Sequence, residues 1–362
     1  MLVDGRIGPP RRPDLDGIAA YSSVRPGPTP IRVRASSNEA AGPVPAELLE
    51  AALAPIRDAH RYPPLLGADL ADAIADRHEV ASGCVAVGDG SLAVLDRLLL
   101  AFVGPGEKVV MGWRSYEGYP LSARIAGARL VQVPLTTNGV HDLPAMAAAV
   151  DAHTRVVIVC NPNNPTGTVV AWSQLLEFLD GLPSSVLAVL DEAYVDYADV
   201  VDRPAGGVPA ELAARPNVAV LRTFSKAHGL AGLRVGYLVA DPMISAAVRS
   251  VSTPFPVSAP AIAAAICSLE HPDWVRDRVL ATRRERDAVR ALLTAHGYPV
   301  LPSQANFVWT ALGAAALDFA EFAAAHGVLV RPFADEGVRI TVGDPLLRPA
   351  LEPVLARWQC PR

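Results

Sequence analysis

The hydrophobic pattern of the chain predicts an α/β protein. Short runs of Val, Ile and Leu recur from residue 84 onwards, and segments with helical spacing lie between the earlier runs. Such near-continuous apolar runs are typical of strands buried on both faces of a sheet. Repeated strand–helix units therefore predict a three-layer fold, a mostly parallel sheet covered by helices on both faces. We expect strands at residues 84–87, 108–111, 129–133, 155–160, 186–190, 218–221 and 235–239, and helices at residues 91–102, 116–125, 143–150 and 172–179.

The pattern changes on either side of this regular region. Residues 1–30 are rich in Pro, Gly and Arg, which disfavours helices and central strands and predicts an N-terminal arm. The last third alternates predicted helices with strands at 307–309, 328–330 and 338–342. We therefore expect an arm (1–30), a large domain (31–245) whose beginning could pack with the small domain, and a smaller α/β C-terminal domain (246–362).

One predicted helix, at residues 274–296, carries a face rich in arginine. Charged faces of this kind are usually solvated, so we expect the arginines to be exposed, with a partner site as the alternative. The arginines are Arg276, Arg278, Arg283, Arg284, Arg286 and Arg290.

Composition narrows the class of protein. Of the 362 residues 51% are hydrophobic and 19% are charged, which allows a large core and disfavours disorder. A net charge of −5 argues against a nucleic-acid surface. The four cysteines lie far apart and the histidines do not cluster, so we expect no metal site. Because neither a leader peptide nor a long apolar run is evident, we expect a cytoplasmic protein without a membrane span.

The first candidate for chemistry is Lys226. It follows Ser225 in a glycine-containing turn between two predicted strands, and Arg234 lies a short way downstream. Loops at strand ends are where α/β enzymes place their reactive groups. An amine beside a hydroxyl and a guanidinium suits a lysine that holds a phosphorylated aldehyde. The alternative is an exposed lysine in a surface turn.

Three further segments fall at the predicted carboxyl ends of strands. Gly88-Asp89-Gly90-Ser91 opens a helix, whose free N–H groups suit a phosphate. The string from Asn161 to Gly167 has two prolines that hold Asn164 in place as a hydrogen-bond donor. Asp191 ends a buried strand, where a carboxylate needs a cation, and Tyr194 follows it. Each segment also has an ordinary structural reading, but together with Lys226 they match the groups of pyridoxal phosphate.

At this point the chain resembles the fold-type I pyridoxal-phosphate aminotransferases. Within that family it is similar to the histidinol-phosphate and aromatic-amino-acid aminotransferase branch. The resemblance runs from Tyr21 to Gly343 and rests mainly on Asn-Pro-Asn-Asn-Pro-Thr-Gly at 161–167, Asp-Glu-Ala-Tyr at 191–194 and the Ser-Lys segment at 225–226 with its following Gly-Leu-Arg-Val-Gly-Tyr. The segments at 112–120 and 131–135 look most like the aromatic-amino-acid members.

The resemblance implies roles in binding pyridoxal 5'-phosphate. Lys226 forms the covalent link to the cofactor and moves the substrate proton. Asp191 keeps the pyridine nitrogen protonated, and Asn164 and Tyr194 hold the ring hydroxyl. Tyr116 stacks on the ring. The residues expected at the phosphate are Gly90, Ser91, Leu92 (through its backbone N–H), Ser225 and Arg234.

The resemblance also implies a substrate site shared across a homodimer. Arg339 would fork onto the substrate carboxylate, a task that suits arginine. Asn38 is expected beside the substrate. Tyr62 would reach the neighbouring subunit's phosphate, and Tyr21 would cover the neighbouring subunit's substrate. The implied reaction transfers an amino group from an aromatic amino acid to 2-oxoglutarate or another 2-oxo acid.

Several alternatives stay open at this stage. Histidinol phosphate is the runner-up substrate, and Arg331 could either bind its phosphate or serve a structural role. Decarboxylation of a phosphorylated amino acid on the same scaffold is a further alternative. A sensing domain of a transcription regulator would need a DNA-binding domain, which residues 1–30 cannot supply. The chain departs from the family pattern at Asp89, Leu92-Ala93 and His228, among other positions. These departures leave open which substrate is preferred and how the site is finely adjusted.

Overall fold

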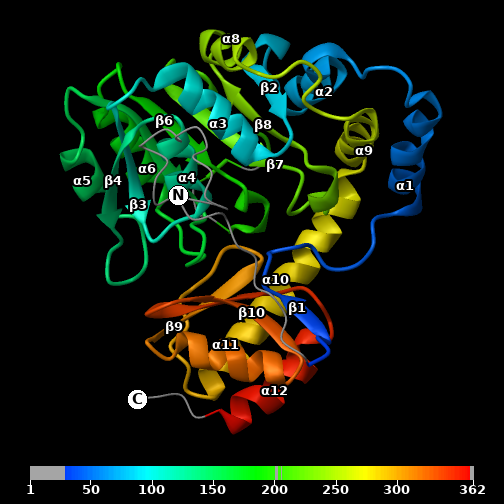
Figure 1. Ribbon diagram of the computed structural model, residues 1–362, viewed down its shortest axis with the longest axis vertical. Helices are drawn as coiled ribbons and strands as arrows, with labels where there is room; N and C mark the ends of the chain where they lie inside the picture. Colours follow the sequence, from blue (N-terminus) through cyan, green and yellow to red (C-terminus); the bar gives the residue numbers. More distant parts are fainter. Residues whose placement is uncertain (1–28, 200–202, 205, 359–362) are drawn as a thin grey trace, which may run out of the picture.

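A computed structural model describes residues 29–199, 203–204 and 206–358. It consists of a large body around a seven-stranded sheet and a small body around a four-stranded sheet, connected by the long helix α10 (Pro272–Ala295) (Figure 1). This confirms the predicted α/β class, with a mostly parallel large sheet. Figure 1 places α1 (Ala46–Leu53) at one side of the large body, beside α9 (Ala259–Glu270).

The large sheet has the strand order β2-β8-β7-β6-β5-β3-β4. Neighbouring strands from β7 to β4 run parallel, whereas β8 is antiparallel to both β7 and β2. Parallel neighbours bring the carboxyl ends of β5, β6 and β7 to one edge, where ligands bind in such sheets. The strands are β2 (Val85–Gly88), β3 (Lys108–Trp113), β4 (Arg129–Pro134), β5 (Thr154–Cys160), β6 (Leu187–Asp191), β7 (Val218–Thr223) and β8 (Gly236–Ala240).

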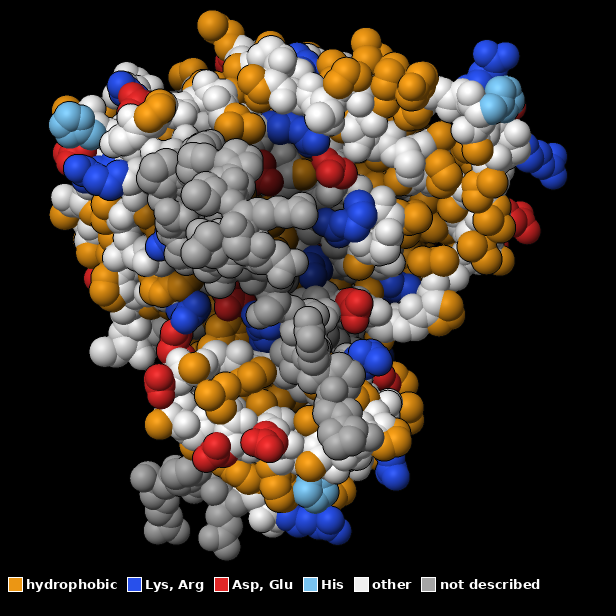
Figure 2. All heavy atoms as spheres, in the orientation of Figure 1, with side chains coloured by type: hydrophobic (Ala, Val, Ile, Leu, Met, Phe, Trp, Pro, Cys, Tyr) orange, Lys and Arg blue, Asp and Glu red, His pale blue; other side chains and the backbone are white. Residues whose placement is uncertain are grey.

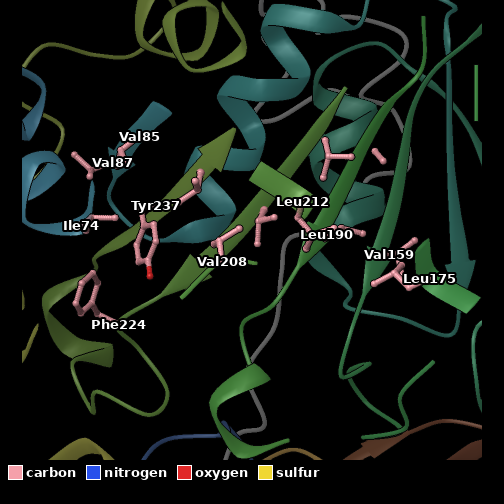
Figure 3. Packing of buried hydrophobic residues seen from close by; sticks show 14 of the residues in the cluster. Ile74, Val85, Val87, Val159, Leu175, Leu190, Val208, Leu212, Phe224 and Tyr237 are labelled. Carbon is pink, nitrogen blue, oxygen red and sulfur yellow. The ribbon is translucent and has the colours of Figure 1, made fainter. Parts of the chain in front are cut away.

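Alternate residues of each strand pack against helices on opposite faces of the large sheet. On β5, Val157 and Val159 belong to one apolar cluster, and Val156 and Ile158 belong to the other. Figure 3 shows the first cluster, in which Leu190, Val208, Leu212 and Phe224 lie among others. The helices that contribute to this first cluster are α1, α2 (Ala68–His78), α5 (Leu143–Ala148), α6 (Trp172–Gly181), α7 (Ala210–Ala213) and α9. The helices α3 (Ser91–Phe102), α4 (Gly118–Ile125) and α8 (Pro242–Ser250) cover the other face.

The small sheet has the order β1-β10-β11-β9, and β1 (Val33–Ala35) pairs in parallel with β10. One face packs on α10, α11 and α12 through Val289, Phe319 and Leu351. The opposite face carries Arg331 and Arg339, which line a cavity next to the large body. The remaining elements are β9 (Phe307–Gly313), β10 (Val328–Phe333), β11 (Glu336–Thr341), α11 (Ala316–Ala325) and α12 (Leu347–Arg357).

Two details differ from the sequence interpretation. Helices α8 and α9 pack on the clusters of the large sheet, so we propose that the domain boundary lies at the start of α10 rather than near residue 245. The arginine face of α10 is not uniformly solvated, because Arg286 is only 3% exposed. Arg283 and Arg286 donate to the backbone oxygen of Tyr197, in a loop that the sequence pattern could not bring next to α10.

Candidate active site

A cavity of about 360 Å³ lies where the carboxyl ends of the large sheet meet the open face of the small sheet. Lys and Arg side chains gather between the two bodies in the space-filling view (Figure 2). Most residues expected at the site line this cavity, although they come from segments far apart in the chain. They are Asn38, Ser91, Leu92, Tyr116, Asn164, Asp191, Tyr194, Ser225, Lys226, Arg234 and Arg339.

The start of α3, which directly follows the turn at Gly90, forms one end of the cavity. Gly90 has φ +107, and a Cβ there would lie 2.4 Å from Nη2 of Arg234. The turn backbone therefore approaches the guanidinium more closely than any other residue would allow. Arg234 also lies 3.4 Å from the hydroxyl of Ser225. The first N–H groups of α3, a hydroxyl and a cation together fit a phosphate.

Asp191 lies at the end of β6, deep in the cavity wall, and is 6% exposed. Its Oδ1 accepts a hydrogen bond from the backbone N–H of Ala193 at 3.0 Å. Its Oδ2 accepts one from the hydroxyl of Tyr119 at 2.6 Å. Burial raises the pKa of Asp191, and the Tyr119 hydrogen bond opposes that shift. A protonated ring nitrogen would supply the cation that this carboxylate needs.

Lys226 is one of two lysines in the chain. The other, Lys108, is the first residue of β3 and pairs with Asp151 at 2.7 Å. The amine of Lys226 donates to the backbone oxygen of Asn38 at 3.0 Å. Burial, followed by the positive charge of Arg339, lowers the pKa of Lys226 to about 7. The amine is therefore available as a nucleophile near neutral pH.

Asn164 and Arg339 meet across the two bodies. The guanidinium of Arg339 donates to Oδ1 of Asn164 at 2.6 Å and to the backbone oxygen of Ser36 at 2.7 Å. With its oxygen engaged, Asn164 has its NH₂ group left to donate to a ligand. Asn38 donates from Nδ2 to the hydroxyl of Tyr194 at 2.9 Å. Asn38 therefore contacts both Lys226 and Tyr194, two residues expected at the site.

Two ion pairs join the large body to the small body at the rim. Arg331 of β10 pairs with Glu117 at 2.7 Å. Arg114 donates to both carboxylate oxygens of Glu336 in β11. Each body thus contributes one arginine and one glutamate to the rim.

Glu192 was not singled out from the sequence, although it follows Asp191 directly. Successive residues at a strand end point to opposite sides, so Asp191 faces the cavity and Glu192 faces away. Glu192 is 4% exposed and pairs with Arg203 and Arg222 at 2.8 and 2.7 Å. Burial acts to raise the pKa of Glu192, but the two arginines hold it below its ordinary value.

The departures from the family pattern have local explanations. Asp89 pairs with Arg97 at 2.8 Å, and about half of its side chain is exposed, so it is neutralised beside the Gly90 turn. His228 bonds the hydroxyl of Ser268 at 2.7 Å and packs on Phe224. Leu92 packs beside Tyr116 at the cavity wall.

Among the described residues, Gly90 and Tyr62 were expected at the site but are not in the lining of this cavity, although Gly90 directly precedes Ser91, which is. Tyr62 is 81% exposed and stacks on Phe255, with ring centroids 4.5 Å apart. Tyr21 lies outside the described residues. Exposed apolar side chains gather over α1 and the turns that follow it, in the same part of the chain as Tyr62, as the orange area in Figure 2 shows. These side chains are Leu49, Leu53, Ile56 and Leu65.

The arrangement brings the amine of Lys226, the buried carboxylate of Asp191 and the guanidinium groups of Arg234 and Arg339 into one cavity. Across the part of the chain that the structure describes, no group of three His, Cys, Asp or Glu residues could hold a metal ion. Among the helices described, none is both long and apolar enough to cross a membrane.

The chain is similar to known proteins over most of its length. The family model for "Aminotransferase class I and II" matches residues 32–349. An aromatic amino acid aminotransferase from Thermobifida fusca is 48% identical over 344 residues, 94% of each chain. One from Nocardia farcinica is 47% identical over 357 residues, 96% of this chain and 99% of that protein.

Among solved structures, the histidinol-phosphate aminotransferase from Sinorhizobium meliloti, in complex with pyridoxal-5'-phosphate, superposes with a TM-score of 0.84. It is 28% identical, and the match covers 95% of this chain and 97% of that one. With a family model spanning most of the sequence and relatives of this similarity, the chain belongs to the class I and II aminotransferase family.

Proposed function

We propose that this enzyme is a pyridoxal-phosphate-dependent aminotransferase that takes an aromatic amino acid as donor and a 2-oxo acid as acceptor. The observation that carries the proposal is the convergence of Lys226, Asp191 and Arg339 on one cavity. When bound, the cofactor supplies an electron sink for the charge that develops at the substrate α-carbon.

The residues of the cavity divide the work between them. Ser225, Arg234 and the start of α3 bind the phosphate, and Asp191 pairs with the ring nitrogen. Lys226 would hold the aldehyde group of the cofactor and, as a free amine, would move a proton at the substrate α-carbon. Its lowered pKa supports this role, because the neutral amine can accept that proton near pH 7. Arg339 binds the carboxylate of the amino acid and of the oxo acid in turn.

The substrate assignment is supported by the names of the two relatives and by the rim. Arg331 lines the cavity, but the carboxylate of Glu117 lies 2.7 Å from its guanidinium. A cation neutralised in this way offers less to a dianionic phosphate than an arginine without a carboxylate partner would. This pairing favours an uncharged aromatic ring over the phosphate of histidinol phosphate.

We also propose a homodimer with shared sites. The apolar area around Tyr62 supports it, because large exposed apolar patches mark interfaces. The free thiols of Cys84, Cys160 and Cys267 fit the reducing conditions of the cytoplasm, where we expect the enzyme.

The test is a comparison of kcat/KM for phenylalanine, tyrosine and histidinol phosphate with one oxo acid. We expect the two aromatic amino acids to be preferred, and Glu117→Gln to increase the relative use of histidinol phosphate. A wild-type preference for histidinol phosphate would overturn the substrate assignment. Absence of a cofactor absorbance that bleaches with amino acid would overturn the aminotransferase mechanism as a whole.

A further inference from the structure

Tyr119 forms a buried contact that the proposed function does not require. It is the second residue of α4 and is 1% exposed. Its hydroxyl donates to Oδ2 of Asp191 at 2.6 Å, across 72 positions of sequence. A short hydrogen bond to a charged oxygen in a water-poor site is among the stronger hydrogen bonds in proteins.

The charge on Asp191 depends on a balance between burial and its neighbours. Burial raises the pKa of Asp191, and the hydrogen bond from Tyr119 is the largest effect that opposes it. Glu192 also raises this pKa, while the Ala193 N–H and Lys226 lower it. The titratable groups that interact electrostatically with Asp191 are Tyr119, Cys160, Glu192, Tyr194 and Lys226.

Tyr119 is itself held as a donor. Burial and the nearby carboxylate raise the pKa of Tyr119 well above its ordinary value, so the hydroxyl keeps its proton. Its ring meets Tyr116 edge to face, with centroids 5.4 Å apart and planes at 88°. A Cβ at Gly118 would lie 2.6 Å from Cε1 of Tyr116, so the glycine between the two tyrosines allows this close approach.

We propose that Tyr119 is a positioning residue that keeps Asp191 ionised and aimed at the ring nitrogen of the cofactor. The inference rests on the proposed function, because it assigns a purpose to the carboxylate only when that cofactor binds. Its edge contact with Tyr116 also connects the residue expected to stack on the cofactor ring with the one expected to bind its nitrogen.

The test is Tyr119→Phe, which removes the hydroxyl and keeps the ring that packs on Tyr116. The dissociation constant of pyridoxal phosphate is measured for the full-length chain between pH 5 and 9. We expect it to rise about tenfold, the size of one lost hydrogen bond to a charged group. Because the pKa of Asp191 rises further in the variant, the pH below which affinity declines should move upwards. For the holoenzyme, kcat should fall more than KM changes.

Tyr197→Phe is a matched control. Tyr197 is also 1% exposed, and its buried hydroxyl has no hydrogen-bond partner in the described part of the chain, so its loss should leave affinity and pH profile unchanged. In an Asp191→Asn background, Tyr119→Phe should lose its pH-dependent effect. This double variant keeps the test decisive if the single variant folds poorly.

Two results would overturn the inference. Unchanged affinity at every pH would show that the hydroxyl does not act on Asp191. A loss of affinity by the same factor at every pH would assign the hydroxyl to packing alone. Either result leaves wild-type cofactor binding intact, whereas a wild-type chain that does not bind pyridoxal phosphate would overturn the proposed function instead.

Discussion

The two walls of the cavity are built from different interactions. The wall of the large sheet holds polar groups that are almost fully buried, such as Asn164 at 4% and Asp191 at 6% exposure. The rim toward the small sheet uses ion pairs that water reaches, with Glu117 and Glu336 side chains 32% and 33% exposed. Both are polar, but only the first is sheltered from solvent.

The difference determines what a substitution costs. A buried polar group that loses its partner retains the full penalty of desolvation, whereas an exposed ion pair contributes about 0–1 kcal/mol. Groups expected to act on the cofactor lie in the buried wall, where a substitution costs most. Groups expected to discriminate between substrates lie at the rim, where a substitution costs little. The following substitutions test this division.

Lys226→Ala should have the largest effect, because it removes the reactive amine from the buried wall. Turnover should fall by at least roughly 10⁴-fold, and the cofactor should bind without a covalent link. Borohydride reduction followed by mass spectrometry measures the link. Lys108→Arg is the control, since it changes the other lysine of the chain and keeps the charge paired with Asp151. Normal turnover in Lys226→Ala would refute the proposed chemistry.

Gly90→Ala should come next. The added Cβ would displace the Arg234 guanidinium, and the positive φ would strain the turn. We expect the dissociation constant of pyridoxal phosphate to rise roughly 10- to 100-fold. Gly106→Ala also places alanine at a positive φ, +79, but has no neighbour within 4 Å, so it tests a positive φ without displacement of a neighbouring side chain. Equal affinity losses in both variants would contradict an anion cup at Gly90.

Arg339→Lys tests the point where the two walls meet. A lysine cannot donate in a fork, so KM should rise roughly 10-fold for the amino acid and for the oxo acid alike. Steady-state kinetics with both substrates measure the change. If KM rises for neither of them, the carboxylate site lies elsewhere.

Arg114→Gln should have the smallest effect, because its partner Glu336 lies at the hydrated rim. The free energy of unfolding should fall by less than about 1 kcal/mol, and added salt should reduce the difference. Urea denaturation at low and high salt measures this. A salt-independent loss of several kcal/mol would place the rim pairs in the same class as the buried wall.

Sequence patterns predicted the strands of the large sheet well because each is a compact apolar run. They did not show that β8 runs antiparallel to its two neighbours, β2 and β7, because an apolar run does not indicate the direction of a strand. No helix was predicted at residues 242–250, where α8 lies, although proline is favoured in a first helical turn and Pro242 begins this helix.

For the site, as for the fold, local sequence patterns were informative and contacts between distant elements were not. Lys226, Asp191 and Asn164 lie in unusual local strings, so the sequence alone identified them. Glu192 lies in one of those strings and Tyr119 lies in the separate segment 112–120, but the partners of both come from other elements. Nothing local indicates that a tyrosine on α4 will meet the end of β6. Such contacts depend on packing of whole elements, which local pattern does not encode.

Asn38 connects the amine of Lys226 to the small body. Its backbone N–H and side chain bond Thr341, and its oxygen accepts from Asn306, so it is anchored to the small body. The same oxygen accepts from Lys226 of the large body. A rotation of the small body about α10 would therefore lengthen this hydrogen bond and release the amine. Opening of the cleft and release of the Lys226 amine would then occur together, because both depend on the position of Asn38.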